Sequence, residues 1–311
     1  MDAITVLLYL YWTSDVLLAL YGWPTTFDWI SPPKLLIDLF QYGKCRDGQI
    51  ESSWVKFIEI PKSWFKHFYF YGFLVSSFMV ALTVGCFLFN YDVIGRRELA
   101  ELFAGRKEVI DEYAVMIICA MMLLQHTRRI YECLFISVYS KGTMNILHYI
   151  LGFLLYTTVQ LCAISDGPKL TLENRSLSTR LQNFDLLEII CHHWNKCLGC
   201  IIFVYASYYH HKSHVILANL RKDRSGKQVL HRQHVIPRGG PFEYLSAPHF
   251  VCEILIYLAM GLLAFQSFTF LMGPVLFTVT NQTLMTYETH KWYKKCFKDY
   301  PKRSWLIPYI L

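Results

Sequence analysis

The sequence has little charge for its length. Asp, Glu, Lys and Arg make up 17% of the 311 residues, whereas hydrophobic residues make up 54% and aromatic residues 16%. An ordinary soluble domain carries about 25% charged residues. The composition therefore excludes a typical soluble domain and indicates an integral membrane protein.

Uncharged windows long enough to cross a membrane, and some shorter ones, recur along the chain. They cover residues 67–91, 113–127, 142–165, 197–211 and 254–287. Since one span needs about 20 residues, the 34 residues of the last window predict two helices, joined by a tight turn at Gly273-Pro274. With an apolar N-terminal segment, the windows predict an all-α membrane protein with seven transmembrane helices.

The N-terminal segment lacks the features of a removed signal peptide. Residues 1–23 contain neither a basic leading region nor a small-residue cleavage site, so we expect them to form a retained first helix. Asp15 interrupts this apolar segment. Because a carboxylate in lipid is costly, we expect Asp15 to face protein or water.

Basic residues are scarce in half of the predicted loops. Loops 24–66, 128–141 and 212–249, together with the tail after Tyr287, hold 22 of the 30 Lys and Arg, and seven lie in the other loops. Because basic loops stay in the cytosol, we expect the N-terminus to be non-cytosolic and the C-terminus cytosolic. The predicted non-cytosolic loops contain no cysteine, which argues against structural disulfides, and they contain a glycosylation sequon at Asn174.

A dinucleotide-binding fingerprint is also missing. No G-x-G-x-x-G motif follows a predicted strand, which excludes a Rossmann domain. No internal repeat or low-complexity tract is present either. We therefore treat residues 1–311 as one multi-pass membrane domain, in which helices and loops would have to hold any dinucleotide.

Titratable residues gather at the predicted cytosolic ends of the helices, where a membrane protein keeps them at a cost. Glu59 precedes the second predicted span, and residues 126–132 close the third with the sequence HTRRIYE. Residues 210–253 contain seven Lys or Arg and six His. His290 and Tyr293 follow the last predicted span. These residues come from different helices, as expected for a site built by the whole bundle.

Three segments carry a family resemblance. They are HVILANLRK (214–222), VIPRGGPFEYLSAPHFVCE (235–253) and YKKCFKDYPKRSWLIPYIL (293–311). In this order and spacing they resemble the C-terminal signature of the steroid 5-alpha-reductase family, here residues 205–311. The residues from His126 to Glu132 are similar to its polyprenol (polyprenal) reductase branch. The resemblance implies a seven-helix enzyme of the endoplasmic reticulum membrane that uses NADPH, and a role in making dolichol for protein N-glycosylation.

The resemblance also implies site residues. Glu59 matches the family's catalytic glutamate, which helps to polarise the substrate oxygen. His126 stands where steroid-reducing relatives have a tyrosine donor, and this departure argues against a steroid substrate. The positions that match the family's cofactor site are Arg129, His214, Asn219, Arg221, His249, Glu253, His290 and Tyr293. Arginine suits this role because its guanidinium binds phosphate bidentately.

Hydride chemistry narrows the substrate. A hydride is a nucleophile, and the double bond of an allylic alcohol has no place for the displaced electron pair. A conjugated aldehyde accepts it as an enolate, whose oxygen Glu59 or His126 can protonate or hydrogen-bond. We therefore favour polyprenal over polyprenol, with its isoprenoid tail in an apolar groove between helices.

Simpler explanations exist for the individual residues. Glu59 is also typical of a solvated carboxylate at the membrane interface, and His126 of a residue that packs at a helix end. Arg221 lies in a basic run that suits lipid headgroups. Glu253 lies near the start of a predicted helix, where a carboxylate stabilises the helix through its dipole.

Three other functions stay open. One is the reduction of a 3-oxo-Δ4 steroid. Another is a di-iron desaturase or hydroxylase, because His210, His211 and His214, with His231 and His234, resemble histidine boxes. The third is a lipid transporter without chemistry. The favoured enzyme predicts a long-chain isoprenoid and the bilayer as partners, and neither a metal nor a nucleic acid.

Overall fold

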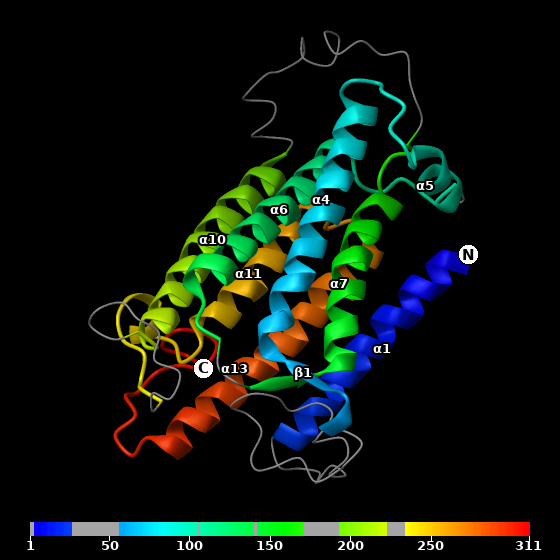
Figure 1. Ribbon diagram of the computed structural model, residues 1–311. Coiled ribbons are helices and arrows are strands. Elements are labelled where there is room, and N and C mark those ends of the chain that lie inside the picture. The colour runs from blue at the N-terminus through cyan, green and yellow to red at the C-terminus, as the bar shows by residue number, and fades with distance from the viewer. Residues whose placement is uncertain (1–2, 27–55, 105, 140–141, 171–192, 223–233) are drawn as a thin grey trace.

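The structure is a computed structural model that describes residues 3–26, 56–104, 106–139, 142–170, 193–222 and 234–311. It is mostly helical, and within these ranges seven helices have 16 or more residues (Figure 1). They are α1 (Ala3–Thr26), α4 (Phe65–Phe87), α6 (Glu112–Tyr131), α7 (Ile146–Ser165), α10 (Trp194–Asn219), α11 (Pro248–Leu263) and α13 (Leu276–Cys296). Each of the seven segments predicted as a span is therefore helical.

Two helices in the described part of the chain are long and apolar enough to cross a membrane: Lys62–Phe87 and Ile146–Ser165. Shorter apolar helices are Val6–Leu17, inside α1, and Pro248–Leu263. α6 and α10 carry charged or polar residues in their C-terminal turns. Length and apolarity thus identify two spans, and the count of seven stays a prediction.

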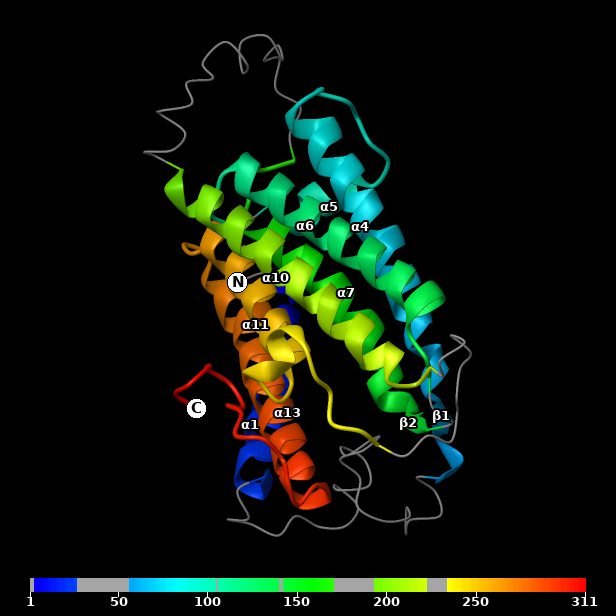
Figure 2. The same ribbon diagram turned by 90° about the vertical axis from the view of Figure 1, so that its left-hand side faces the viewer.

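The helices pack in two connected groups. α4 packs against α6 and α7, whereas α10 packs along α11, and α13 lies against both α11 and α1. Contacts of α6 with α10 and α11 join the groups, and Figure 2 shows α10 and α6 side by side. Asp15 of α1 is only 6% exposed, which confirms that it faces protein.

A short antiparallel pair of strands ties two helices together at one end. β1 (Glu59–Pro61) pairs with β2 (Thr143–Asn145), with Glu59 opposite Asn145. α4 follows β1 after the short helix η2 (Lys62–Trp64), and α7 follows β2 directly. The side chain of Asn145 then caps α7 by accepting a hydrogen bond from the backbone N–H of Leu147 at 2.8 Å. The pairing therefore fixes the starts of α4 and α7 relative to each other, next to Glu59.

The histidine-rich segment is more helical than the sequence predicted. We expected a span over 197–211 and a loop from 212, but α10 continues to Asn219. The extra turns place His210 and His214 four residues apart on one helix face. Their polar side chains bind other helices of the bundle, so the loss of apolar residues marks a buried site here and does not mark the end of the helix.

The turn predicted at Gly273-Pro274 is also misplaced. α11 ends at Leu263, and the chain turns at residues 264–267 before the short helix α12 (Phe268–Phe270). Gly273 and Pro274 lie instead in the π-helical turn η5 (Leu271–Val275), which leads into α13. A π turn accommodates a proline that lacks an N–H. Gly273 is required because a Cβ there would lie 2.8 Å from the Trp12 ring.

The end of the bundle opposite the strands is closed by an ion pair, and we call it the α5 end after the helix α5 (Arg96–Leu102) (Figure 1). Arg106 donates from Nη1 to Asp166 Oδ1 at 2.8 Å, and Ser267 donates from Oγ to Asp166 Oδ2 at 2.5 Å. The backbone N–H groups of Val109 and Ile110 donate to the Asp166 carbonyl. Asp166, which follows α7, thus connects the loop between α5 and α6 to the turn after α11. The sequon at Asn174 lies outside the described residues.

Candidate active site

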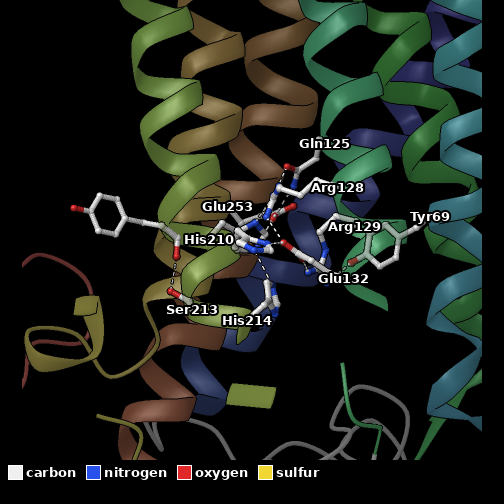
Figure 3. A network of polar contacts seen from close by, with 11 residues as sticks. Tyr69, Gln125, Arg128, Arg129, Glu132, His210, Ser213, His214 and Glu253 are labelled. Atoms are coloured by element: carbon white, nitrogen blue, oxygen red, sulfur yellow. Dashed lines mark hydrogen bonds and ion pairs between the residues drawn. The ribbon is translucent and has the colours of Figure 1, made fainter. Parts of the chain in front are cut away.

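A buried polar cluster lies toward the strand end of the bundle, where α6, α10 and α11 meet (Figure 3). We call it the arginine cluster. Its members are Tyr69, Gln125, Arg128, Arg129, Glu132, His210, His211, His214 and Glu253. Both of its arginines lie in the last turn of α6, where cations interact favourably with the helix dipole.

Glu132 is the central acceptor of the cluster. It begins the π-helical turn η3 (Glu132–Ile136), and its side chain is fully buried. Its carboxylate accepts from Arg128 Nη1 at 2.8 Å, from Arg129 Nη1, and contacts His211 Nδ1 at 2.9 Å. Burial by itself would raise the pKa of this carboxyl, but Arg129 and Arg128 outweigh burial and hold the pKa of Glu132 below its usual range.

Arg128 connects α6 to α10 and α11. Its Nη2 donates to Gln125 Oε1 at 2.5 Å and to His210 Nδ1 at 2.7 Å. Because Nδ1 of His210 accepts, the proton of the neutral ring lies on Nε2. That nitrogen lies 3.0 Å from His214 Nε2 and 3.4 Å from Glu253 Oε2. The contacts form one continuous chain across three helices.

Arg129 connects the cluster to α4. Its Nη2 donates to the Tyr69 hydroxyl at 3.2 Å, and the guanidinium carbon lies 4.8 Å from the centre of the Tyr69 ring. The tyrosine therefore holds the guanidinium through a hydrogen bond and a cation–π contact. Both interactions fix the position of Arg129 beside Glu132.

His126 lies one turn before Arg129 on α6 and is fully buried. Its Nδ1 contacts Ser76 Oγ of α4 at 2.8 Å, and Gln160 of α7 donates from Nε2 to the same hydroxyl at 2.7 Å. Tyr156 of α7 packs edge-on against the imidazole, with 4.4 Å between ring centroids. The other ring nitrogen, Nε2, is buried and has no hydrogen-bond partner among the described residues.

A second polar group lies beside the start of α11, and we call it the tail cluster. Ser246 Oγ contacts His290 Nδ1 at 2.6 Å and accepts from the Tyr300 hydroxyl at 2.9 Å. Tyr293 stacks on Tyr300 with ring centroids 5.3 Å apart. Arg303, 8% exposed, donates from Nη1 to the carbonyl of Pro237 at 2.9 Å.

Buried guanidinium nitrogens in both clusters lack partners. Among the described residues, Arg128 Nε and Arg303 Nε and Nη2 are buried without a hydrogen-bond acceptor. An unsatisfied charged donor is costly, and phosphate oxygens are good acceptors for it. These donors therefore fit a ligand that carries several phosphates, such as a nicotinamide dinucleotide.

The structure brings four of the predicted cofactor residues together. Arg129, His214 and Glu253 belong to the arginine cluster, and the His249 ring lies 5.7 Å from that of His214. Glu253 lies in the second turn of α11 and contacts Gln125 and His210, so the helix dipole does not explain it. These positions come from α6, α10 and α11.

The other predicted residues lie elsewhere. His290 and Tyr293 belong to the tail cluster. Glu59 lies on β1, and Asn219 is exposed at the end of α10. Arg221 donates from Nη1 to the carbonyl of Val138 at 2.9 Å, so in this structure it holds the loop after η3.

Several residues of the site had no predicted role in it. Arg128, Glu132, His210 and His211 stand in segments that were expected to gather at the site, but no cofactor role was assigned to them. Tyr69 and Gln125 in the arginine cluster, and Ser76, Tyr156 and Gln160 beside His126, were not predicted. Ser76 and Gln160 lie inside apolar windows, where an uncharged polar side chain is itself a sign of a buried contact. That signal was available in the sequence.

The histidines of the proposed box are engaged within the protein. His210 and His214 contact each other, and His211 contacts Glu132. Within the described ranges, no group of three or more His, Cys, Asp or Glu is arranged to hold a metal ion. His231 lies outside those ranges.

The structure is thus a helical bundle with two helices apolar enough to cross a membrane and a buried cationic cluster, the kind of site that suits an anionic ligand. The profile of the 3-oxo-5-alpha-steroid 4-dehydrogenase family matches residues 172–311. Polyprenal reductase of Xenopus tropicalis is 32% identical over 278 residues, which cover 88% of this chain and 87% of that protein. The Homo sapiens protein of the same name is 31% identical over 282 residues, which cover 88% of this chain and 85% of that protein.

The chain belongs to this steroid 5-alpha-reductase family. It is therefore an oxidoreductase that acts on a CH–CH group, and the reductases of this family use a nicotinamide cofactor. Together with the two apolar helices, the family makes it a membrane protein.

Proposed function

We propose that the protein reduces the α,β double bond of a polyprenal with NADPH and yields the saturated dolichal. The relatives that share most of its length are named polyprenal reductase. The site supports the same chemistry, because an unpartnered imidazole nitrogen lies one helical turn from a buried cationic cluster. This juxtaposition of His126 and the arginine cluster is the observation that carries the proposal.

The roles of the cofactor residues follow from the unsatisfied donors. Arg128 with its neighbour Arg129, and Arg303 of the tail cluster, would bind the phosphates of NADPH, and His214 and Glu253 would orient the rest of the dinucleotide. When bound, the cofactor supplies a hydride to the β-carbon of the terminal isoprene. Glu132 keeps the guanidiniums fixed, so they need not reorganise when the ligand binds.

Glu59 and His126 act on the substrate oxygen. As the double bond gains the hydride, negative charge develops on the aldehyde oxygen, and a positioned donor stabilises it there. The α-carbon then takes a proton. The closed helices around His126 exclude water, which strengthens these hydrogen bonds.

We place the enzyme in the endoplasmic reticulum membrane as one multi-pass domain over residues 1–311, with seven spans, a non-cytosolic N-terminus and a cytosolic C-terminus. The charge bias of the loops supports this orientation. β1, β2 and η4 (Gly240–Glu243) lie toward the same end of the bundle as the arginine cluster (Figure 2), so NADPH from the cytosol would reach it. In this setting the product serves dolichol synthesis for protein N-glycosylation.

Isotope transfer tests the proposal. The purified protein in detergent is incubated with NADPH deuterated at the nicotinamide 4-position and, separately, with polyprenal, polyprenol and a 3-oxo-Δ4 steroid. We expect deuterium in the saturated product of polyprenal alone. Deuterium only in the steroid product would mean that the substrate is a steroid and not polyprenal. No transfer to any of the three compounds would refute the function.

A Glu59→Gln variant tests the catalytic assignment. It should lower kcat about 100-fold or more, because a positioned acid contributes about 10²–10⁴-fold, and leave the Kd for NADPH unchanged. Parental turnover in this variant would remove Glu59 from the mechanism.

A further inference from the structure

Three helices contribute to the surroundings of His126. On α4, Tyr69, Gly72 and Ser76 share one face because they lie three and four residues apart. On α7, Tyr156 and Gln160 are likewise four residues apart. Ser76, His126 and Gln160 are all 0% exposed. The hydroxyl of Ser76 therefore joins α7 to the imidazole in a site that is closed to bulk solvent.

The Ser76 hydroxyl differs from several hydroxyls of the long helices that bond to their own backbone. Thr83, Thr127 and Ser213 each donate to the backbone carbonyl four residues earlier, at 2.7–2.8 Å. Ser76 makes no such bond among the described residues. Its oxygen accepts from Gln160 Nε2 at 2.7 Å, so the only acceptor left for its proton is His126 Nδ1 at 2.8 Å.

The direction of these bonds fixes the state of the ring. If Nδ1 accepts from Ser76, it carries no proton, and the neutral imidazole carries its proton on Nε2. We propose that Ser76 and Gln160 are positioning residues that hold His126 as the Nε2–H tautomer, so that Nε2 donates to the aldehyde oxygen of the substrate. The inference rests on the proposed function, which it deepens by assigning the donor atom.

Gly72 lets α4 pack closely against the imidazole of His126. A Cβ on Gly72 would lie 2.7 Å from His126 Nε2. The edge-on contact with Tyr156 restrains rotation of the ring. Nε2 thus has a fixed direction, lies against the Gly72 backbone and has no hydrogen-bond partner of good geometry within the described residues.

The tautomer is measured directly. Full-length protein labelled with ¹⁵N-histidine is examined by NMR in detergent, and a His126→Asn variant assigns the signals. We expect a protonated Nε2 and an unprotonated Nδ1 in the parental protein, and a mixture of tautomers in Ser76→Ala. A protonated Nδ1 in the parental protein would overturn the proposal, because Ser76 would then accept and Gln160 would have the opposite orientation.

Kinetics test the consequence. Ser76→Ala and Gln160→Met should each lower kcat about tenfold or more, with the KM for polyprenal and the Kd for NADPH unchanged. Thr83→Val is the matched control, since it also removes a buried hydroxyl from α4 but not one that contacts His126, and it should keep the parental kcat. Parental kcat in both Ser76→Ala and Gln160→Met would overturn the positioning role.

Failure of the inference and failure of the proposed function give different results. If the parental protein transfers no deuterium to polyprenal, the function is wrong, while the tautomer is still read from the NMR signals without substrate. If the parental protein is active and His126→Phe, which has no hydrogen-bond donor, is equally active, His126 donates nothing and the inference fails alone.

Discussion

The two ends of the helical bundle both bury charge, but they do so differently. At the α5 end, one guanidinium faces one carboxylate, and Arg106 and Asp166 bind neighbouring loops and helices. In the arginine cluster, two guanidiniums and three imidazoles surround two carboxylates. Burial of charge is thus common to both ends, and each end holds a buried guanidinium nitrogen without a hydrogen-bond acceptor in the described ranges, Arg106 Nη2 and Arg128 Nε. The excess of basic groups over carboxylates in the arginine cluster is what distinguishes a site that suits an anionic ligand from a one-to-one ion pair that holds the fold.

Loss of Glu132 should have the largest effect on stability. Glu132→Ala leaves Arg128 and Arg129 buried without their shared carboxylate, and breaking a buried pair costs about 3–5 kcal/mol. We expect the lowest unfolding midpoint of the variants here, measured by thermal unfolding in detergent. Glu132→Gln, which keeps the shape and one acceptor, is the control and should fall between. A parental midpoint in Glu132→Ala would mean that the arginine cluster is not held by its central acid.

Loss of Asp166 should affect stability but not the site. Asp166→Ala also breaks a buried ion pair, and we expect a loss of about 3 kcal/mol. The folded fraction should keep the parental kcat and the parental Kd for NADPH, because the α5 end takes no part in the reaction. A raised Kd would break the comparison, since it would show that both ends serve the ligand.

Arg128 should affect the ligand more than the fold. Arg128→Ala removes a donor without leaving Glu132 unpaired, since Arg129 still binds it. We expect the Kd for NADPH to rise about tenfold, equal to about 1.4 kcal/mol, as measured by fluorescence titration. Arg97, whose side chain is 74% exposed at the α5 end, supplies the matched control, and Arg97→Ala should leave the Kd unchanged. Arg128→Lys should recover only part of the affinity, because lysine lacks the planar fork.

Acid should weaken the arginine cluster in a window set by Glu132. Its pKa in the folded protein is below the ordinary value of 4.5, so its contribution is complete above about pH 4.5 and is lost as pH falls through the lowered pKa. Thermal midpoints between about pH 7 and pH 3 should show this loss. In Glu132→Gln the acid-dependent part should shrink. An unchanged profile in that variant would assign the acid sensitivity to other groups.

Most of the helices could be predicted because a helix that crosses a bilayer needs a long apolar segment, which is visible in the sequence. The errors occurred where another requirement outweighed apolarity. α10 continues past residue 211 because its histidines are satisfied by other helices, which a single-sequence pattern does not show. The Gly273-Pro274 dipeptide does not end the helix, because a π turn accommodates the proline. The chain turns instead at residues 264–267.

The site was predictable only where a motif carried it. Arg129, His214 and Glu253 stand in family-like segments, and the structure brings them together. Arg128 has the same charge as its neighbour, so only the geometry of α6 shows that it reaches α10. Ser76 and Gln160 are remote from His126 in sequence and belong to no motif, and their meeting depends on the packing of α4 and α7. The catalytic role of Glu59 stays a prediction that the Glu59→Gln variant tests, and the cofactor role of Arg221 stays a prediction.

The contact between α1 and α13 has a consequence for how the chain is made. Trp12 rests on Gly273, and the Tyr9 hydroxyl contacts Thr269 Oγ1 at 3.2 Å. α1 leaves the ribosome long before α12, η5 and α13 exist, so these contacts of Tyr9 and Trp12 form only when synthesis is almost finished. Premature termination before residue 268 would leave the contacts unmade, and such fragments should be recognised and degraded by the cell's quality control.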